Sequence, residues 1–197
     1  GEIRGRYSIV GMRPDKIWKC LGKKSYIKNL EQNGRGAFTQ QDHDPLTKLR
    51  DFLSERYIDI PTSLPQASAG IFGYLGYATI RLIEDLPNLN PDPIGVPDGV
   101  CLRPSLIAVL DGAKGEVILV APVWHDKNRN AKTSYENASK LINDAIKKLD
   151  REILETRDLG SPSNINPPIS NFSKDDYIQA VKKAQEYIVA GDIFQVV

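Results

Sequence analysis

The amino-acid sequence predicts an α+β fold, in which antiparallel strands are combined with a small number of helices. Three observations favour this class. The first forty residues alternate short apolar runs with turn residues, as consecutive antiparallel strands do. Segments with apolar residues at helical spacing occur at intervals along the chain. No regular strand–helix–strand alternation is present, which argues against a doubly wound parallel sheet.

The N-terminal part is predicted to form short strands followed by one helix. We expect strands over residues 7–10, 16–20 and 25–27, separated by turn residues at 12–15 and 22–24. Asp44 and Pro45 are the residue types that favour the N-cap and the first position of a helix. The apolar residues on one face of this helix are Leu46, Leu49, Phe52, Leu53 and Tyr57.

The middle of the chain contains a glycine-rich segment and a hairpin. We interpret residues 69–77 as a strand whose glycines allow close packing, because the segment lacks the lysine of a P-loop and the spacing of a dinucleotide fingerprint. A short helix is expected over residues 80–86. The apolar runs 105–110 and 116–121 predict a hairpin across the turn residues 111–115.

The C-terminal part is predicted to contain two helices, a linker and a last strand. The first helix is predicted from about residue 132 to 157, with an apolar seam along one face. Residues 159–170 include three prolines, so we place a domain boundary there. Ser173 and Gly191 then have the residue types of an N-cap and a left-handed C-terminal position. Residues 193–197 read as a buried strand, and since a strand needs partners, we expect the second unit to be truncated at the C-terminus.

Composition excludes several classes of function. Hydrophobic residues make up 41% of the chain and charged residues 26%, as in soluble globular proteins, and no apolar run approaches the length of a membrane helix. The 26 Lys and Arg nearly balance the 25 Asp and Glu, which argues against a nucleic-acid partner. Cys20 and Cys101 are expected to be reduced and buried. With His43 and His125 as the only histidines, we predict no metal ligand in this chain.

One segment has residues suited to binding a small ligand. Arg4 and Arg6 supply a guanidinium fork for a carboxylate, and Tyr7 supplies an aromatic platform. A structural role on the surface or in the core explains the same residues. Ser8 has no histidine or lysine close in sequence to activate it as a nucleophile. A second group near the glycine-rich segment, Arg81, Glu84 and Asp85, either orients a ligand or forms a solvated ion-pair cluster.

Three stretches together resemble a known enzyme family. Residues 5–11, GRYSIVG, are followed by Pro14. Residues 70–81, GIFGYLGYATIR, are followed by Glu84-Asp-Leu-Pro87, and residues 190–197 read AGDIFQVV. In this order and spacing they resemble the N-terminal portion of anthranilate synthase component I, a chorismate-utilising enzyme family, and the resemblance spans essentially the whole chain. Ala78 departs from it, because the family usually has Asp at this position.

The resemblance implies a fold, an activity and a domain organisation. The fold would be part of a four-layer α/β/β/α sandwich with antiparallel sheets and flanking helices. The parent would be a cytoplasmic lyase that converts chorismate and ammonia to anthranilate in tryptophan biosynthesis, with Mg²⁺ and a glutamine amidotransferase subunit as partner. Residues 1–158 would form the regulatory domain, 159–170 the linker, and 171–197 the start of the chorismate-binding domain. The active site would lie beyond Val197, so we assign no catalytic residue and expect the chain alone to be inactive.

The resemblance also implies a regulatory site. In this family tryptophan acts as a feedback inhibitor, and the GRYS segment contributes Arg6, Tyr7 and Ser8 to its pocket, here with an incomplete set of walls. Two alternatives stay open. The parent would instead be aminodeoxychorismate synthase component I, or the chain would be a non-catalytic ligand-binding or interaction module.

Overall fold

The computed structural model describes residues 5–30, 34–54, 58–87, 91–124, 130–151 and 167–196. The chain divides into two compact units, residues 1–151 and 152–197, which are described separately. The predicted domain boundary at 159–170 lies mostly outside the described residues. Within the described part of the chain, no helix is both long and apolar enough to cross a membrane.

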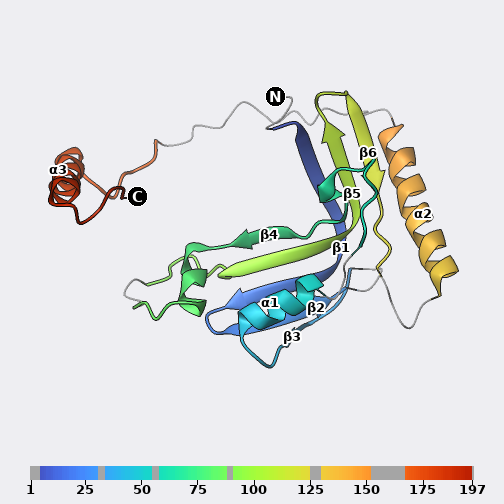
Figure 1. Ribbon diagram of the computed structural model, residues 1–197, viewed down its shortest axis with the longest axis horizontal. Coiled ribbons are helices and arrows are strands. Elements are labelled where there is room, and N and C mark those ends of the chain that lie inside the picture. Colours follow the sequence, from blue (N-terminus) through green and yellow to red (C-terminus); the bar gives the residue numbers. More distant parts are fainter. Residues whose placement is uncertain are drawn as a thin grey trace. The chain divides into compact units, whose positions relative to one another are not determined.

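The first unit is built on an antiparallel sheet (Figure 1). The described strands have the order β3-β2-β1-β5-β4, and β6 pairs with β5 as well. Every pairing is antiparallel, which confirms the predicted α+β class with an antiparallel sheet and flanking helices. The strands are β1 (Tyr7–Leu21), β2 (Lys24–Asn29), β3 (Phe38–Gln40), β4 (Phe72–Leu75), β5 (Gly99–Asp111) and β6 (Glu116–Val120).

Strand β1 is one long strand where the sequence predicted two. The residues interpreted as a turn, 12–15, continue the pairing with β5, and the register shifts only between Pro14 and Lys16. Asp15 is the extra residue there, as in a β-bulge, and Arg13, just before the shift, adopts a positive φ of 49°. The prediction of a turn was wrong because arginine, proline and aspartate suit a bulge as well as a turn.

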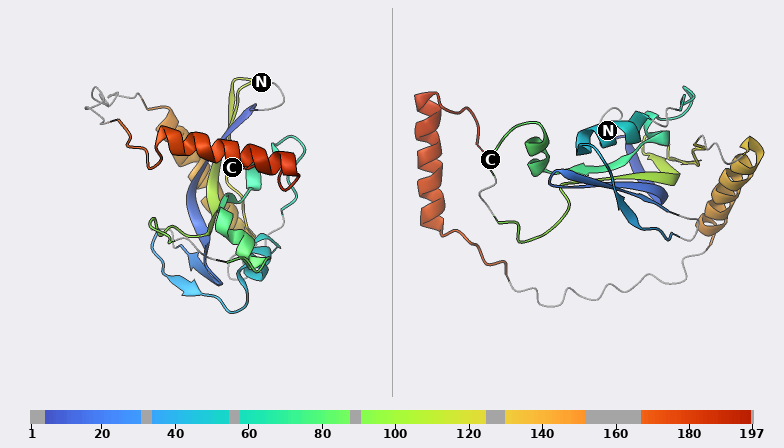
Figure 2. Two further views of the ribbon diagram at one scale, coloured as in Figure 1. Left: turned by 90° about the vertical axis from the view of Figure 1, so that its left-hand side faces the viewer. Right: turned by 90° about the horizontal axis from the view of Figure 1, so that it is seen from below.

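Strand β5 has one partner on one side and two on the other. β1 pairs with it along its whole length, and the two strands run side by side in Figure 1 and Figure 2. On the opposite side, β4 pairs with residues 99–102 and β6 with residues 107–111. Pro104 lies in the interval between them, where a residue without a backbone N–H costs no ladder hydrogen bond. The predicted hairpin across residues 111–115 is confirmed.

Helix α1 (Pro45–Ser54) covers one face of the sheet and completes its core (Figure 1). Asp44 caps the helix as predicted, since its Oδ1 accepts hydrogen bonds from the backbone N–H groups of Leu46 and Thr47. Leu49 and Phe52 are buried together with Trp18 and Cys20 of β1. Cys20 and Cys101 are free thiols, the first buried and the second half-buried.

The glycine-rich segment contains a shorter strand than predicted. It forms a 3-10 helix, η1 (Gln66–Ala69), then β4, then a second 3-10 helix, η2 (Tyr77–Leu82), which begins before the helix expected over residues 80–86. A Cβ atom on Gly73 would lie 1.9 Å from the backbone oxygen of Val100. Glycine at this position therefore permits the close approach of β4 to β5, which supports the packing interpretation.

Helix α2 (Ala131–Leu149) is shorter than the predicted helix over residues 132–157. Asn130 caps its first turn by accepting a hydrogen bond from Thr133 N, and the helix packs against β5. The helix ends at Leu149, and residues 152–157 lie outside the described residues. The apolar seam continued further than the helix because periodicity alone does not mark a helix end.

The second unit contains α3 (Lys174–Ala190), whose predicted caps are both present. Ser173 Oγ accepts a hydrogen bond from Asp176 N, and Gly191 adopts φ 80°. The strand predicted over residues 193–197 is not formed at 193–196, and Val197 lies outside the described residues. Phe194 is 93% exposed, and a β-prone run becomes a strand only when a neighbouring strand pairs with it.

Candidate functional site

Arg6, just before β1, is held by a buried carboxylate at the end of β5. Its Nε donates to Asp111 Oδ1 at 2.8 Å, and its Nη2 donates to Oδ2 at 2.6 Å. The side chain of Arg6 is 28% exposed and that of Asp111 only 2%. The two side chains thus form a bidentate pair in which the cation reaches solvent and the anion does not.

Asp111 also organises the turn between β5 and β6. Its Oδ1 accepts further hydrogen bonds from the backbone N–H groups of Ala113 and Lys114, at 3.1 and 3.3 Å. Gly112 N donates to the backbone oxygen of Arg6 at 2.9 Å. The turn therefore fixes Arg6 through both its backbone and its side chain.

The charges of this pair stabilise each other. The hydrogen bonds from Arg6 are the main cause that lowers the pKa of Asp111 to about 2, and the two backbone N–H donors of the turn act in the same direction. The hydrogen bond to Asp111 is in turn the main cause that raises the pKa of Arg6. Both groups stay ionised throughout the neutral range.

The structure brings Tyr7 to Arg6 but places Ser8 on the other face of the strand. The guanidinium carbon of Arg6 lies 5.0 Å from the centre of the Tyr7 ring, and Tyr7 is 41% exposed. Tyr7 pairs with Asp111 and Ser8 with Leu110, so alternation along the strand directs Tyr7 and Ser8 to opposite faces. Arg6, Tyr7 and Asp111 therefore form one cluster, whereas Ser8 is exposed outside it.

Sequence reasoning did not include Asp111 in the site. The residue was interpreted as ordinary turn chemistry, and its two hydrogen bonds to the turn agree with that. Its contact with Arg6 joins residues 105 positions apart and depends on the register of β1 against β5. The signal in the sequence was an aspartate at the end of an apolar strand, which is too common to indicate a partner.

A second arginine–aspartate pair joins the same two strands at the bulge. Arg103 donates through Nε to Asp15 Oδ1 at 2.6 Å, and its Nη2 bonds Oδ2. The Arg103 guanidinium lies 5.2 Å from the centre of the Trp124 ring. Here the arginine is buried, with a side chain only 5% exposed.

The other predicted group does not form a cluster. Arg81 donates to the backbone oxygen of Pro87 at 3.3 Å. Among the described residues, no ion pair joins Arg81 to Glu84 or Asp85. The described residues also contain no group of three or more side chains able to hold a metal ion, so we assign no metal ligand.

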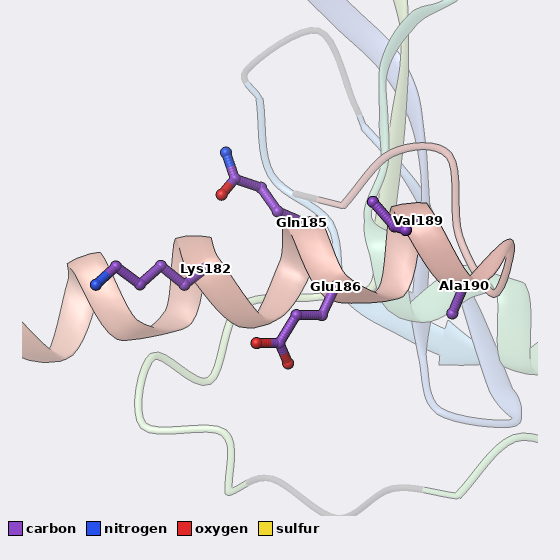
Figure 3. Close-up of a pocket in the computed structure, with 5 residues that line it drawn as sticks. All are labelled: Lys182, Gln185, Glu186, Val189 and Ala190. Atoms are coloured by element: carbon purple, nitrogen blue, oxygen red, sulfur yellow. The ribbon is translucent and has the colours of Figure 1, made fainter.

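Two depressions are lined by residues other than Arg6, Tyr7 and Asp111. The first is open and lies along one side of α3, as Figure 3 shows, with its walls formed by one helix: Lys182, Gln185, Glu186, Val189 and Ala190. The second is a cavity of about 250 Å³ with mainly apolar walls, lined by Ile58, Ile60, Pro61, Leu64, Ser68, Ala69, Val120, Pro122 and Val123. The polar side chain among them is that of Ser68, whose Oγ is buried and has no hydrogen-bond partner among the described residues.

Comparison with known proteins identifies the class of this chain. The model of the chorismate binding enzyme family matches residues 13–197. The chain therefore belongs to this family.

Relatives that match the whole chain share the name anthranilate synthase component 1. The chain is 50% identical, over all of its 197 residues, to anthranilate synthase component 1 of Cereibacter sphaeroides, of which it covers 39%. It is 31% identical over 207 residues to the protein of the same name from Pseudomonas putida, of which it covers 40%. The chain thus spans about two fifths of the length of these relatives.

A solved structure has the same fold. The crystal structure of anthranilate synthase component I from Streptococcus pneumoniae matches 98% of this chain and 40% of its own length, with a TM-score of 0.60 and 20% sequence identity. The described residues form one antiparallel sheet with flanking helices, and the second sheet of the predicted four-layer sandwich is not among them.

Proposed function

We propose that this chain is the N-terminal portion of an anthranilate synthase component I, which converts chorismate and ammonia to anthranilate in tryptophan biosynthesis. The observation that carries the proposal is the 50% identity to a relative of that name along the whole chain. The alternatives are aminodeoxychorismate synthase component I and a non-catalytic binding module. Further relatives at 29–32% identity are also named anthranilate synthase component 1, and they favour anthranilate synthase over both alternatives.

The proposal includes groups that act outside this chain. Mg²⁺ would be the metal of the active site, a glutamine amidotransferase subunit would supply ammonia, and the enzyme would be cytoplasmic. The described residues do not form a Mg²⁺ site, because they contain no cluster of metal-ligating side chains. That this chain holds neither catalytic residues nor metal ligands stays a prediction.

The contribution of this chain would be regulatory, through a tryptophan site at Arg6, Tyr7 and Ser8. The exposed part of Arg6 supports this role, since a guanidinium has five N–H donors and Asp111 takes two of them. The remaining donors suit the carboxylate of an amino acid, and the exposed ring of Tyr7 offers a surface for an indole. Ser8 belongs to the predicted set, but it lies on the opposite face of β1 and outside the cluster of Arg6, Tyr7 and Asp111.

Product analysis of the full-length protein tests the proposed activity. With chorismate, ammonia and Mg²⁺, we expect anthranilate, which is identified by its fluorescence, whereas residues 1–197 alone should form none. Aminodeoxychorismate as the product would establish the first alternative. Absence of any reaction with chorismate, in a folded full-length protein, would favour the binding module.

A further inference from the structure

Asp111 has the geometry of a residue that acts through Arg6 and not on a ligand directly. Its side chain is 2% exposed, and its two oxygens accept four hydrogen bonds, two from Arg6 and two from the turn. A buried carboxylate with this many donors has little capacity left for a ligand group. Any effect on a ligand must therefore pass through the guanidinium.

The orientation of Arg6 depends on this carboxylate. A free arginine side chain has several rotatable bonds and loses considerable entropy when it is held in one geometry. Asp111 binds the Nε–Nη2 edge, and Gly112 N fixes the backbone oxygen of Arg6. The ring of Tyr7, 5.0 Å from the guanidinium carbon, limits its movement further.

We propose that Asp111 is a positioning residue of the tryptophan site, which holds Arg6 so that its Nη1–Nη2 edge receives the carboxylate of an amino acid. This inference rests on the proposed function. Two donors on that edge are parallel and match the two oxygens of a carboxylate. Glu116, the register partner of Asp111, adds a negative charge near Arg6, which disfavours ligands with more than one carboxylate.

The substitution Asp111→Asn separates positioning from turn formation. The amide oxygen of asparagine can still accept hydrogen bonds from Ala113 N and Lys114 N, but the charged bidentate contact with Arg6 is lost. In the full-length protein, we expect the dissociation constant of tryptophan, measured by calorimetry, to rise roughly tenfold, which is the loss of about one charge-assisted hydrogen bond. If Asp111→Asn does not fold, Asp111→Ser provides the same test, because its hydroxyl also supports the turn.

A double-mutant cycle shows whether Asp111 acts through Arg6. In an Arg6→Ala background, Asp111→Asn should cause no further loss of tryptophan affinity. The matched control is Asp15→Asn, the same change in the other arginine–aspartate pair, which should leave the dissociation constant unchanged.

The outcomes distinguish the inference from the proposed function. Wild-type tryptophan affinity in folded Asp111→Asn, together with weakened binding in Arg6→Ala, would overturn the positioning role and keep the site. An additional loss in the double variant would also overturn it. Unchanged binding in Arg6→Ala would instead overturn the assignment of the site itself.

Discussion

Two arginine–aspartate pairs connect the β1 region to β5, and each exposes a different partner. In the pair at the β5–β6 turn, the side chain of Arg6 is 28% exposed and that of Asp111 is 2% exposed. In the pair at the bulge, the side chain of Arg103 is 5% exposed and that of Asp15 is 30% exposed. Both aspartates accept from Nε and Nη2 of their arginine. The same chemistry therefore presents a cation to solvent at one site and a carboxylate at the other.

This difference indicates which pair is able to bind an anionic ligand. Arg103 is buried between Asp15 and the ring of Trp124, and its Nη1 has no hydrogen-bond partner among the described residues. That pair stabilises the bulge and offers no donor to solvent. The side chain of Arg6 stays partly accessible while a buried anion holds its guanidinium, as preorganised recognition of a carboxylate requires.

The largest expected effect is on the bulge pair. Asp15→Ala removes the carboxylate that neutralises a buried arginine, and breaking a buried pair in this way costs about 3 kcal/mol. Urea denaturation of the 197-residue chain measures the loss in unfolding free energy. We expect a smaller loss for Asp111→Ala, because the charge of Arg6 reaches water without its partner. A larger loss for Asp111→Ala would contradict the conclusion that the bulge pair contributes more to stability than the pair at the turn.

The pH dependence of stability tests the contribution of the pair between Arg6 and Asp111 at the turn. The pKa of Asp111 falls from its ordinary value of 3.8 to about 2 in the folded state, mainly through the hydrogen bonds from Arg6. Because the pKa is lower in the folded state, the ionised carboxylate stabilises the fold above pH 3.8. This contribution is lost as the pH falls towards about 2.

The corresponding measurement is the difference in unfolding free energy between the wild type and Asp111→Asn. It should be constant near neutral pH and should decrease between pH 3.8 and about 2. The lowered pKa of Asp44, caused mainly by hydrogen bonds from Thr47, is common to both proteins and cancels in the difference. A difference independent of pH would contradict the assigned role of Arg6.

Local parts of the fold were predictable from the sequence. The caps of α3 and α1 were identified from Ser173, Gly191 and Asp44, because capping depends on residues within one turn of the helix. The hairpin across residues 111–115 was identified for the same reason. Such signals require no knowledge of what packs against the element.

Features that depend on distant partners were not predictable. The continuous pairing of β1 through residues 12–15 is imposed by β5, about ninety residues further on, and the sequence there reads as a turn. The predicted strand at 193–196 is unpaired because a strand exists only with a neighbour. For the candidate site, Arg6 and Tyr7 were identified from their residue types, whereas Asp111 required the register of two strands.

A smaller effect is expected from the aromatic rings beside the two arginines. Trp124→Leu removes the ring beside buried Arg103, where a cation–π contact contributes about 2 kcal/mol, whereas exposed contacts such as that of Tyr7 contribute about 0.5–1 kcal/mol. Urea denaturation should therefore show the larger loss for Trp124→Leu. For Tyr7→Leu we expect the main change in tryptophan binding by the full-length protein. Equal losses of stability in both variants would remove the distinction between a structural and a ligand-binding pair.

The smallest effect is expected from an ion pair that resembles neither of the two. Lys48 Nζ lies 3.1 Å from Asp51 Oδ2 within α1, and the side chain of Asp51 is 48% exposed. This pair joins neighbours on one helix, has a single contact and is open to solvent, so its contribution should be about 0.3–0.5 kcal/mol. Lys48→Gln should lower the unfolding free energy by no more than that, and the difference should disappear in 1 M salt, where the Debye length is about 3 Å.

The loss in Asp15→Ala should persist at the same salt concentration, because salt screens a buried pair far less. If both losses disappeared in salt, burial would not be the property that separates the arginine pairs from an ordinary surface pair.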